Sequence, residues 1–252
     1  DRGGGRMSDL VLREDRDSIA YLTLNRPAQL NALSPSLFVE LRKHVDDIAA
    51  SQETVGCVVL RGEGRSFSAG NDIKAIQSGD RAPSAHFQAE TIDALESLPQ
   101  PVIAAVTGHC YTGALELALG CDFIVAGESA RFADTHGKWS MTPTWGMSQR
   151  LPRRIGTARA KQMMFTGTPV SGVEAVALGL ANVCVPDEQL ASTVDELAAA
   201  IVANSWHTLR ADKSLVNEGQ QFALREALAY ERRTSPGAGP DMAERLKSFG
   251  AR

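Results

Sequence analysis

The 252-residue sequence predicts an α/β protein with a mainly parallel sheet and a helical C-terminal part. Two observations indicate this class. Up to about residue 146, short apolar runs that suit buried strands alternate with longer segments in which apolar residues recur at helical spacing. Strand–helix–strand units of this kind pack with their strands parallel. Beyond that point helical segments dominate, with one further strand.

The N-terminal half supplies the strands of the expected sheet. Segments 11–14 and 19–24 flank a polar turn and predict a hairpin. Ser34 and Pro35 are typical of the start of a helix, which we expect to end near residue 50. The other elements expected here are a strand at 55–61, a glycine-rich loop at 62–70, a helix at 85–98, a strand at 101–106, a helix at 113–119 and a strand at 122–126.

The C-terminal half is expected to be mostly helical. The helices are predicted at 147–155, 158–165, 172–178, 190–203, 209–230 and 241–249, with one strand near 181–185. We therefore expect an α/β core over residues 7–200 and a helical region over residues 201–252. Residues 1–6 are rich in glycine and arginine, and no hydrophobic segment follows them. They are expected to be an appended leader rather than a targeting peptide.

Composition and charge argue against several classes of function. The formal net charge is −4, so no basic field indicates a nucleic-acid or anionic-membrane partner. No apolar run approaches the roughly 18 residues of a membrane span. The four cysteines lack a C-x-x-C pair, so we expect buried thiols rather than disulfides or metal ligands. A cytoplasmic protein without a metal site fits these observations.

The glycine-rich loop follows a strand, as nucleotide-binding loops do, but its spacing is wrong. The dinucleotide fingerprint needs a glycine where Phe67 stands, and the Gly-Lys-Ser/Thr end of a P-loop is absent. A nucleophile elbow around Ser66 fails because Ser68 replaces its last glycine. We expect neither kind of site here.

Two other segments have the pattern of an oxyanion-binding site. Segments 66–74 and 107–122 each place small residues before a helix start, where backbone N–H groups are unpaired. Two such amides aimed at one point stabilise a developing oxyanion better than a neutral carbonyl. Glu116 lies one helical turn after Gly113 and can face the same point. The residues alone leave open that the glycines only permit close packing and that Glu116 is solvated.

These segments resemble signatures of the crotonase superfamily, the enoyl-CoA hydratase/isomerase family. Residues 67–74 (FSAGNDIK) look like F-x-A-G-x-D-[IL]-K, and residues 108–122 (GHCYTGALELALGCD) are similar to G-x-x-x-G-G-G-x-E-L-A-x-x-C-D. Residues 24–33 (LNRPAQLNAL) resemble L-N-R-P-x-x-x-N-A-L, and residues 148–156 (SQRLPRRIG) resemble [TS]-Q-R-L-P-R-x-[IV]-G. The resemblance covers nearly all of residues 10–249. It implies the crotonase (ClpP-like) fold, with repeated ββα units and a helical C-terminal trimerisation region.

The resemblance also implies the roles of individual residues. The amides of Asn71 and Gly113 are expected to form the oxyanion hole of an acyl-CoA thioester, with Glu116 as the main acid/base. Coenzyme A belongs to the substrate, so no separate cofactor is expected, and relatives are usually trimers or dimers of trimers. Residues expected to bind the substrate or its CoA part are Ala28, Gln29, Leu30, Ala69, Asp72, Ile73 and Tyr111. Weaker candidates from the C-terminal helices are Lys247 and Phe249.

The chain departs from the family pattern at three positions. His136 stands where hydratases carry their second glutamate, and a pocket role is expected for it because histidine relays protons near neutral pH. Asp134 is expected to be a local turn or surface residue rather than a replacement carboxylate. Thr144 stands where isomerases often carry Asp or Glu. Ala28 replaces a lysine that many relatives use for the CoA phosphate, and Arg26 is a candidate substitute.

We therefore expect an enoyl-CoA hydratase that adds water reversibly to a 2-enoyl-CoA, with Glu116 and His136 as catalytic residues. Other thioester-enolate chemistry, such as isomerisation, decarboxylation or thioester hydrolysis, stays open. So does a non-catalytic acyl-CoA-binding protein, because the second glutamate is missing.

Overall fold

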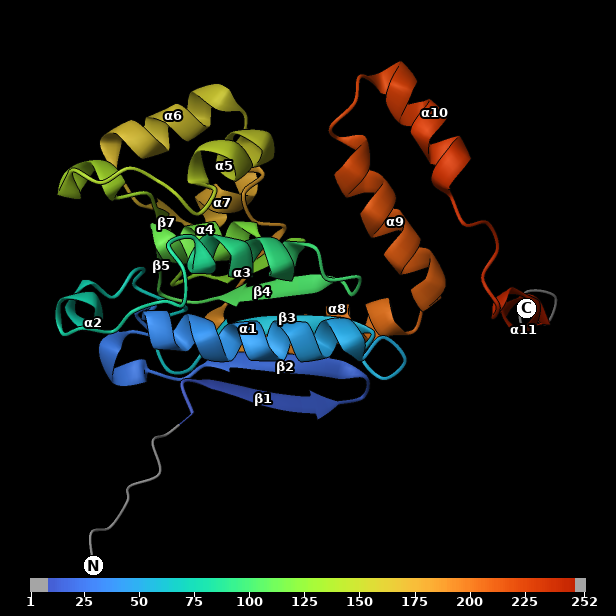
Figure 1. The fold of residues 1–252 in the computed structure, drawn as a ribbon, viewed down its shortest axis with the longest axis horizontal. Helices are drawn as coiled ribbons and strands as arrows, with labels where there is room; N and C mark the ends of the chain where they lie inside the picture. The colour runs from blue at the N-terminus through green and yellow to red at the C-terminus, as the bar shows by residue number, and fades with distance from the viewer. Residues whose placement is uncertain (1–8, 248–252) are drawn as a thin grey trace, which may run out of the picture.

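The computed structural model describes residues 9–247, which form two sheets with helices around them (Figure 1). The larger sheet has the strand order β1-β2-β3-β4-β6-β9. Its strands are β1 (Val11–Arg16), β2 (Ile19–Leu24), β3 (Cys57–Gly62), β4 (Val102–Val106), β6 (Phe123–Gly127) and β9 (Val183–Val185). Only the β1–β2 pair is antiparallel, and the remaining neighbours are parallel. The expected mainly parallel α/β fold is confirmed.

The opening hairpin follows from its turn. Asp17 and Ser18 both have positive φ, 51° and 62°, which is the two-residue turn whose twist matches that of the flanking strands. Arg16 and Ile19 pair directly across it. β2 then lies between β1 and β3 and is buried along its whole length, as a central strand should be.

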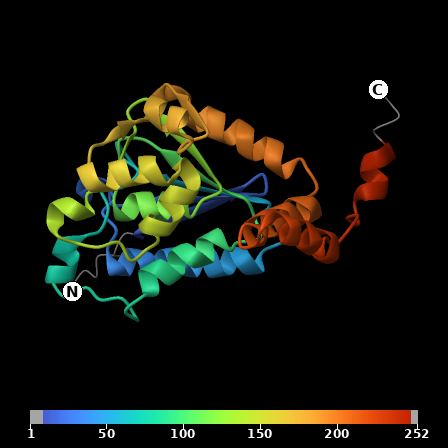
Figure 2. The ribbon, with the colours of Figure 1, turned by 90° about the horizontal axis from the view of Figure 1, so that it is seen from above.

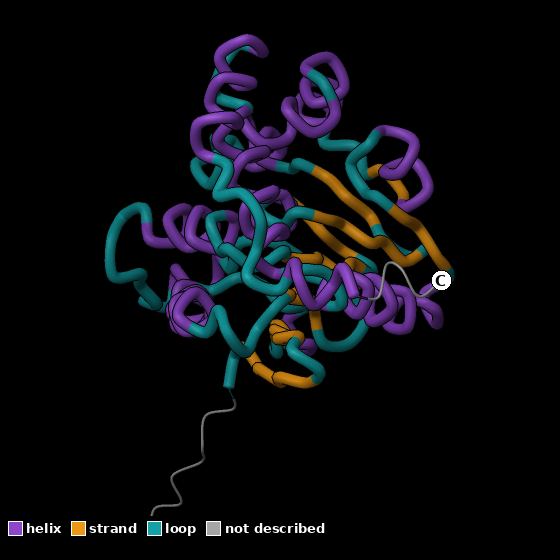
Figure 3. The backbone as a smooth tube through the Cα atoms, turned by 90° about the vertical axis from the view of Figure 1, so that its right-hand side faces the viewer, coloured by secondary structure: helices purple, strands orange, loops and turns teal. Residues whose placement is uncertain are grey.

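The two faces of the large sheet are covered by different helices. Alternate residues of β2 separate onto the two faces, because successive side chains of a strand point in opposite directions. Ala20 and Leu22 join the core beneath α1 (Pro35–Ala50) and α3 (Phe87–Glu96). Ile19 and Tyr21 join the core beneath α8 (Asp187–Val202). Figure 2 shows α1 and α3 on one side of the strands and α8 on the other, and Figure 3 shows the layers from the side.

A small second sheet lies beside the first and leads into the helix that carries Glu116. It consists of β5 (His109–Tyr111), β7 (Arg131–Ala133) and β8 (Val170–Ser171). Strands of two or three residues carry no readable periodicity, which is why β5 and β8 were not expected from the sequence. α4 (Gly113–Leu119) begins directly after β5, and all seven of its residues are buried. Glu116 therefore lies in the interior and is not a solvated helix residue.

The remaining short elements lie around this core. Arg26 and Ser34 each precede a helix that begins with proline, and the Ser34 hydroxyl accepts a hydrogen bond from the Leu37 amide, as the sequence predicted. The elements not yet given are η1 (Pro27–Gln29), α2 (Ile73–Gln77), η2 (His136–Trp139), α5 (Met147–Ile155), α6 (Thr157–Thr166) and α7 (Gly172–Leu178).

The C-terminal helical region differs from the prediction in one respect. The single helix expected over residues 209–230 is wrong, because α9 (Trp206–Gly219) and α10 (Leu224–Thr234) are separate helices. The chain leaves α9 after Gly219, the poorest helix former besides proline, and Ala223 is extended before α10. Lys213 on α9 pairs with Asp122 of the core, with 2.8 Å between Nζ and Oδ2. α9 is thereby tied to the core.

The last helix stands apart from the core in Figure 1. This helix, α11 (Met242–Lys247), is joined to the α8–α9 junction by a 2.8 Å hydrogen bond from the Ser205 hydroxyl to Asp241. Lys247 pairs locally with Glu244. Phe249 and residues 1–6 lie outside the described residues. Between residues 9 and 247, no helix is long and apolar enough to cross a membrane.

Candidate active site

The loop that follows β3 presents one unpaired backbone amide. Leu33 pairs with this loop as an isolated parallel bridge, donating its N–H to the Gly70 carbonyl and accepting from the Asp72 N–H, at 2.8 and 3.0 Å. Asn71 lies between these two hydrogen bonds. Its own N–H donates to no acceptor within residues 9–247. The bridge therefore fixes the Asn71 peptide while leaving its amide available to a ligand.

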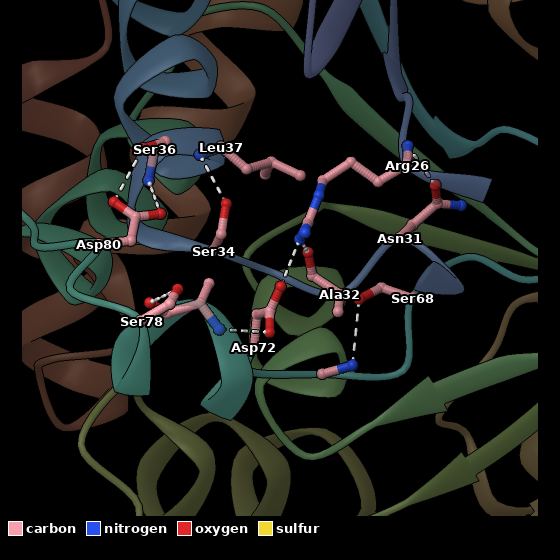
Figure 4. Close-up of polar contacts among 12 residues, drawn as sticks. Arg26, Asn31, Ala32, Ser34, Ser36, Leu37, Ser68, Asp72, Ser78 and Asp80 are labelled. Carbon is pink, nitrogen blue, oxygen red and sulfur yellow. Dashed lines mark hydrogen bonds and ion pairs between the residues drawn. The ribbon is translucent and has the colours of Figure 1, made fainter. Parts of the chain in front are cut away.

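An ion pair between Arg26 and Asp72 also holds this loop (Figure 4). Asp72 caps α2 by accepting from the Ala75 amide at 2.9 Å, and its other oxygen accepts from Arg26 Nη1 at 2.7 Å. The same Arg26 nitrogen also donates to the Ala32 carbonyl. Burial opposes ionisation of Asp72, but the Ala75 amide and Arg26 outweigh it and lower the pKa of the carboxyl. Arg26 is therefore engaged in holding the loop that follows β3 and carries the Asn71 amide, called the oxyanion loop below, and is not a free cation for a CoA phosphate.

The second amide belongs to Gly113 and lies beside the first. A β-carbon built on Gly113 would be 3.5 Å from the Asn71 nitrogen, and one built on Gly70 would be 3.6 Å from the Gly113 nitrogen. Like that of Asn71, the Gly113 N–H has no acceptor within the described part of the chain. The structure thus brings together the two amides that the sequence predicted. Two adjacent unpaired donors form a site for a developing negative oxygen.

Glycine is required at positions 70 and 113. Gly70 has φ +97°, and an added β-carbon would lie 2.6 Å from the Tyr111 carbonyl oxygen. An added β-carbon on Gly113 would lie 2.5 Å from the Trp145 ring. Any side chain would therefore displace the backbone that carries the amides or the ring that covers them.

Glu116 is held by two backbone amides. Its carboxylate Oε1 accepts hydrogen bonds from the Trp145 and Met147 N–H groups, each at 3.0 Å. Burial raises the pKa of the carboxyl, and these hydrogen bonds partly oppose the rise. The side chain is 1% exposed. The two hydrogen bonds fix Oε1 and leave the second oxygen, Oε2, facing His136.

His136 faces that second oxygen. Its Nε2 lies 3.9 Å from Glu116 Oε2, and its Nδ1 lies 2.6 Å from Asp134 Oδ1. Burial lowers the pKa of the imidazole, but the hydrogen bond and charge of Asp134, together with Glu116, reverse the direction and raise it. The structure thus places His136 beside Glu116, and its role in a substrate pocket stays a prediction.

Asp134 was expected to be a turn or surface residue, and the surface alternative is wrong. It is 1% exposed, and one oxygen accepts both the His136 backbone amide, at 3.0 Å, and the imidazole Nδ1. A carboxylate on Nδ1 keeps the proton on that nitrogen and leaves Nε2 to face the site. Asp134 is therefore a partner of His136, and the pair stands where hydratases carry one glutamate.

Sequence reasoning missed the residue that connects the two halves of the site. Thr112 precedes Gly113 and has φ 54° and ψ −109°, a conformation that strains a β-branched residue by roughly 1–3 kcal/mol. Its hydroxyl contacts Thr135, the residue between Asp134 and His136. A threonine between a strand and a helix-starting glycine is the only signal that the sequence offers. The Trp145 and Met147 amides have no signal, because every residue carries one.

The residues expected to bind CoA surround the oxyanion loop. The Leu30 carbonyl accepts from the Ala69 amide at 2.9 Å, which joins the bend after η1 to the loop. Ile73 is 41% exposed at the start of α2, and the Tyr111 ring packs edge-on against His109. Ala28 and Gln29 are exposed on η1. Their contacts with CoA remain predictions.

Comparison with known proteins identifies the family. A model of the family described as enoyl-CoA hydratase/isomerase matches residues 14–241. The chain belongs to this family. A crystal structure of the enoyl-CoA hydratase from Bacillus anthracis matches with a TM-score of 0.90 and 33% identity, covering 96% of each chain. The crotonase fold expected from the sequence is thereby confirmed.

Relatives within the enoyl-CoA hydratase/isomerase family include both hydratases and an isomerase. The short-chain-enoyl-CoA hydratase of Clostridium acetobutylicum is 35% identical and covers 88% of this chain and 86% of its own length. A monofunctional enoyl-CoA isomerase from M. smegmatis is 34% identical with a TM-score of 0.76, covering 87% of this chain and 98% of its own. Overall similarity therefore does not distinguish hydration from isomerisation. The distinction has to come from the residues of the site.

Proposed function

We propose that the protein is an enoyl-CoA hydratase. The observation that supports this most directly is the 3.9 Å separation of Glu116 Oε2 and His136 Nε2 next to two unpaired amides. A single water can hydrogen-bond two groups separated by about 4 Å. Water addition needs a group that takes a proton from the attacking water and another that gives one to the substrate. The two side chains supply such a pair.

In the proposed reaction the thioester oxygen accepts from the Asn71 and Gly113 amides. The Glu116 carboxylate takes a proton from the water as its oxygen bonds to Cβ of the enoyl group. The electron pair of the Cα=Cβ bond moves toward the thioester, and its charge is stabilised by the two amides. Protonated His136 then gives its Nε2 proton to Cα. Transfer of the proton from Glu116 back to His136 restores the starting state, and no redox or metal cofactor is consumed.

The local sequence supports hydration over isomerisation. An isomerase of this family often carries Asp or Glu at the position of Thr144, and residues 141–146 contain no carboxylate. A hydrated product is heavier than its substrate by one water, whereas an isomer has the same mass. Mass spectrometry of the product therefore separates the two proposals.

The first test is loss of the conjugated enoyl-thioester absorbance with short and long 2-enoyl-CoA substrates. The proposal expects turnover by the native chain and none by Glu116→Gln, which keeps the size of the side chain. Calorimetric binding of an acyl-CoA without turnover of any chain length would instead indicate a non-catalytic binding protein. A free CoA thiol product would indicate thioester hydrolysis.

We further propose that the protein forms homotrimers or dimers of trimers in the cytoplasm. The C-terminal helices α9 and α10 support the assembly, because Val216, Phe222 and Leu224 are large apolar residues that are 44–76% exposed. Val216 lies on α9, Leu224 begins α10 and Phe222 lies in the connection between them, and exposed apolar residues so placed favour burial against another subunit. The four free cysteines support a reducing compartment. Light scattering at several concentrations tests the assembly, and cell fractionation tests the location.

A further inference from the structure

The Thr112 hydroxyl connects the oxyanion amide to the loop that carries His136. Its Oγ1 accepts a hydrogen bond from the Thr135 amide at 3.0 Å and lies 2.6 Å from the Thr135 hydroxyl. The Thr112 amide also donates to the Ala133 carbonyl at 2.8 Å. Three contacts therefore fix residues 133–135 to the residue that precedes Gly113.

The strained backbone conformation of Thr112 indicates that its hydroxyl has a structural role in the site. Its φ of 54° and ψ of −109° lie outside the regions that β-branched residues normally occupy. Glycine would adopt the same backbone without strain but would leave the Thr135 amide without this acceptor. Strain held in place by surrounding contacts is found mostly at functional sites. The side chain is buried, so the hydroxyl acts within the protein and not on solvent.

We propose that Thr112 is a positioning residue that sets the distance between the oxyanion hole and the Asp134–His136 pair. Its peptide determines where the Gly113 amide points, and its hydroxyl determines where Thr135 places the neighbouring Asp134 and His136. Neither the peptide nor the hydroxyl of Thr112 contacts the reacting carbons in this scheme. The inference rests on the proposed hydration, because it assigns His136 a proton-transfer role.

Three variants separate the hydroxyl from the shape and the strain of the side chain. Thr112→Val keeps the β-branched shape without the hydroxyl. Thr112→Gly also lacks the hydroxyl, but it relieves the backbone strain at this position. It therefore tests loss of the hydroxyl in a variant whose folding does not have to overcome that strain. Thr112→Ser retains the hydroxyl. Thr91→Val is a matched control, because the buried Thr91 hydroxyl also bonds a backbone group, the Phe87 carbonyl, but on α3.

The readouts are kcat and KM for enoyl-CoA hydration, and nitrogen NMR of the His136 ring. We expect kcat to fall about 10- to 100-fold in Thr112→Val and Thr112→Gly, with a smaller change in KM, since misplacement of a reacting group by about 1 Å costs this much. Thr112→Ser recovers most of the loss. The His136 ring signals shift in the two variants without the hydroxyl, because the ring moves relative to Asp134 and Glu116, the charged groups that face it.

Two results would overturn the inference. One is a kcat and His136 spectrum in Thr112→Val and Thr112→Gly equal to those of the native chain. The other is an equal fall of kcat in Thr91→Val, which would indicate a general loss of packing. Failure of the hydratase proposal is distinguishable, since the native chain would then not hydrate enoyl-CoA while the NMR comparison would still report whether Thr112 positions His136.

Discussion

The Nε2 atom of His136 lies 3.9 Å from Oε2 of Glu116. A histidine and a glutamate at this separation differ chemically from the pair of carboxyl groups that the family pattern leads one to expect. Two carboxyl groups repel each other when both are ionised, whereas an imidazolium and a carboxylate stabilise each other's charged forms. Each group therefore favours the charged form of the other, and the proposed reaction uses both charged forms, the carboxylate to accept a proton and the imidazolium to give one.

Glu116→Gln should remove hydration while retaining the fold and acyl-CoA binding. The amide oxygen can still accept from the Trp145 and Met147 amides, so the side chain stays in place. We expect kcat to fall by roughly 10²–10⁴-fold, the usual effect of losing a general acid/base. Steady-state kinetics and calorimetric binding check this prediction. Retained turnover would assign the chemistry to another residue.

The activity should follow a bell-shaped pH profile. Glu116 has to be ionised, and burial raises its pKa, so the acid limb should lie above the ordinary glutamate value of 4.5. His136 has to be protonated, and its pKa is raised, so the alkaline limb should lie above the ordinary histidine value of 6.5. kcat/KM measured across pH tests both limbs. An activity that keeps rising above pH 6.5 without a decline would contradict the role of protonated His136.

Asp134→Asn should move mainly the alkaline limb of the pH profile to lower pH. The substitution keeps the shape of the side chain but removes the negative charge on Nδ1 that raises the pKa of His136. Loss of that charge lowers the pKa of the imidazole, so the protonated form is lost at a lower pH. The acid limb, set mainly by burial of Glu116, should stay or move slightly downward. An unchanged alkaline limb would show that another group titrates there.

Arg26→Met should loosen the oxyanion loop. Its partner Asp72 is mostly buried, and an unpaired buried carboxylate costs roughly 1–3 kcal/mol. Because the pKa of Asp72 is lowered in the folded state, the pair stabilises the fold above the ordinary aspartate value of 3.8, and this contribution is lost as pH falls through the lowered value. We expect a lower free energy of unfolding at neutral pH and a lower kcat.

Arg42→Met is the matched control for this variant. Arg42 pairs with Asp46 one turn along the exposed side of α1, with 2.7 Å between Nε and Oδ1. Exposed pairs of this kind contribute little to stability. Denaturant unfolding and initial rates should therefore distinguish the two variants. Equal losses in both would mean that Arg26 has no special role in the loop.

Gly113→Ala should impair the oxyanion hole without removing an amide. The added methyl group would collide with the Trp145 ring, and the same tryptophan donates its backbone N–H to Glu116. Displacing the ring or the helix start moves both the oxyanion donor and the base. We expect a fall in kcat of about 10²–10³-fold, similar to loss of one donor. Rates that match the native chain would show that the site relaxes freely around the methyl group.

The sequence predicted the large sheet and most helices because these elements are long enough to carry a periodic pattern. The hairpin, α1, α4 and α7 end within a few residues of the expected limits. The break between α9 and α10 was missed, because Gly219 is a single glycine and residues 220–223 contain no further proline or glycine that would mark a loop. β5 and β8 are too short to show any alternation.

The candidate site divides in the same way. The positions of Asn71, Gly113, Glu116 and His136 followed from motif resemblance, and the structure brings them together. The burial of Asp134 did not follow, because an aspartate before a turn is normally solvated and only the fold places it under His136. The engagement of Arg26 by Asp72 joins residues 46 positions apart, which no local pattern reveals.

The most direct measurement is the mass of the product formed from a 2-enoyl-CoA in water enriched in heavy oxygen. If Glu116 and His136 add water to the enoyl group, the native chain gives a product heavier by one labelled water, with the label on Cβ, and Glu116→Gln gives none. A product of unchanged mass, or label found only in a released carboxylic acid, would contradict the account and assign the site to isomerisation or thioester hydrolysis.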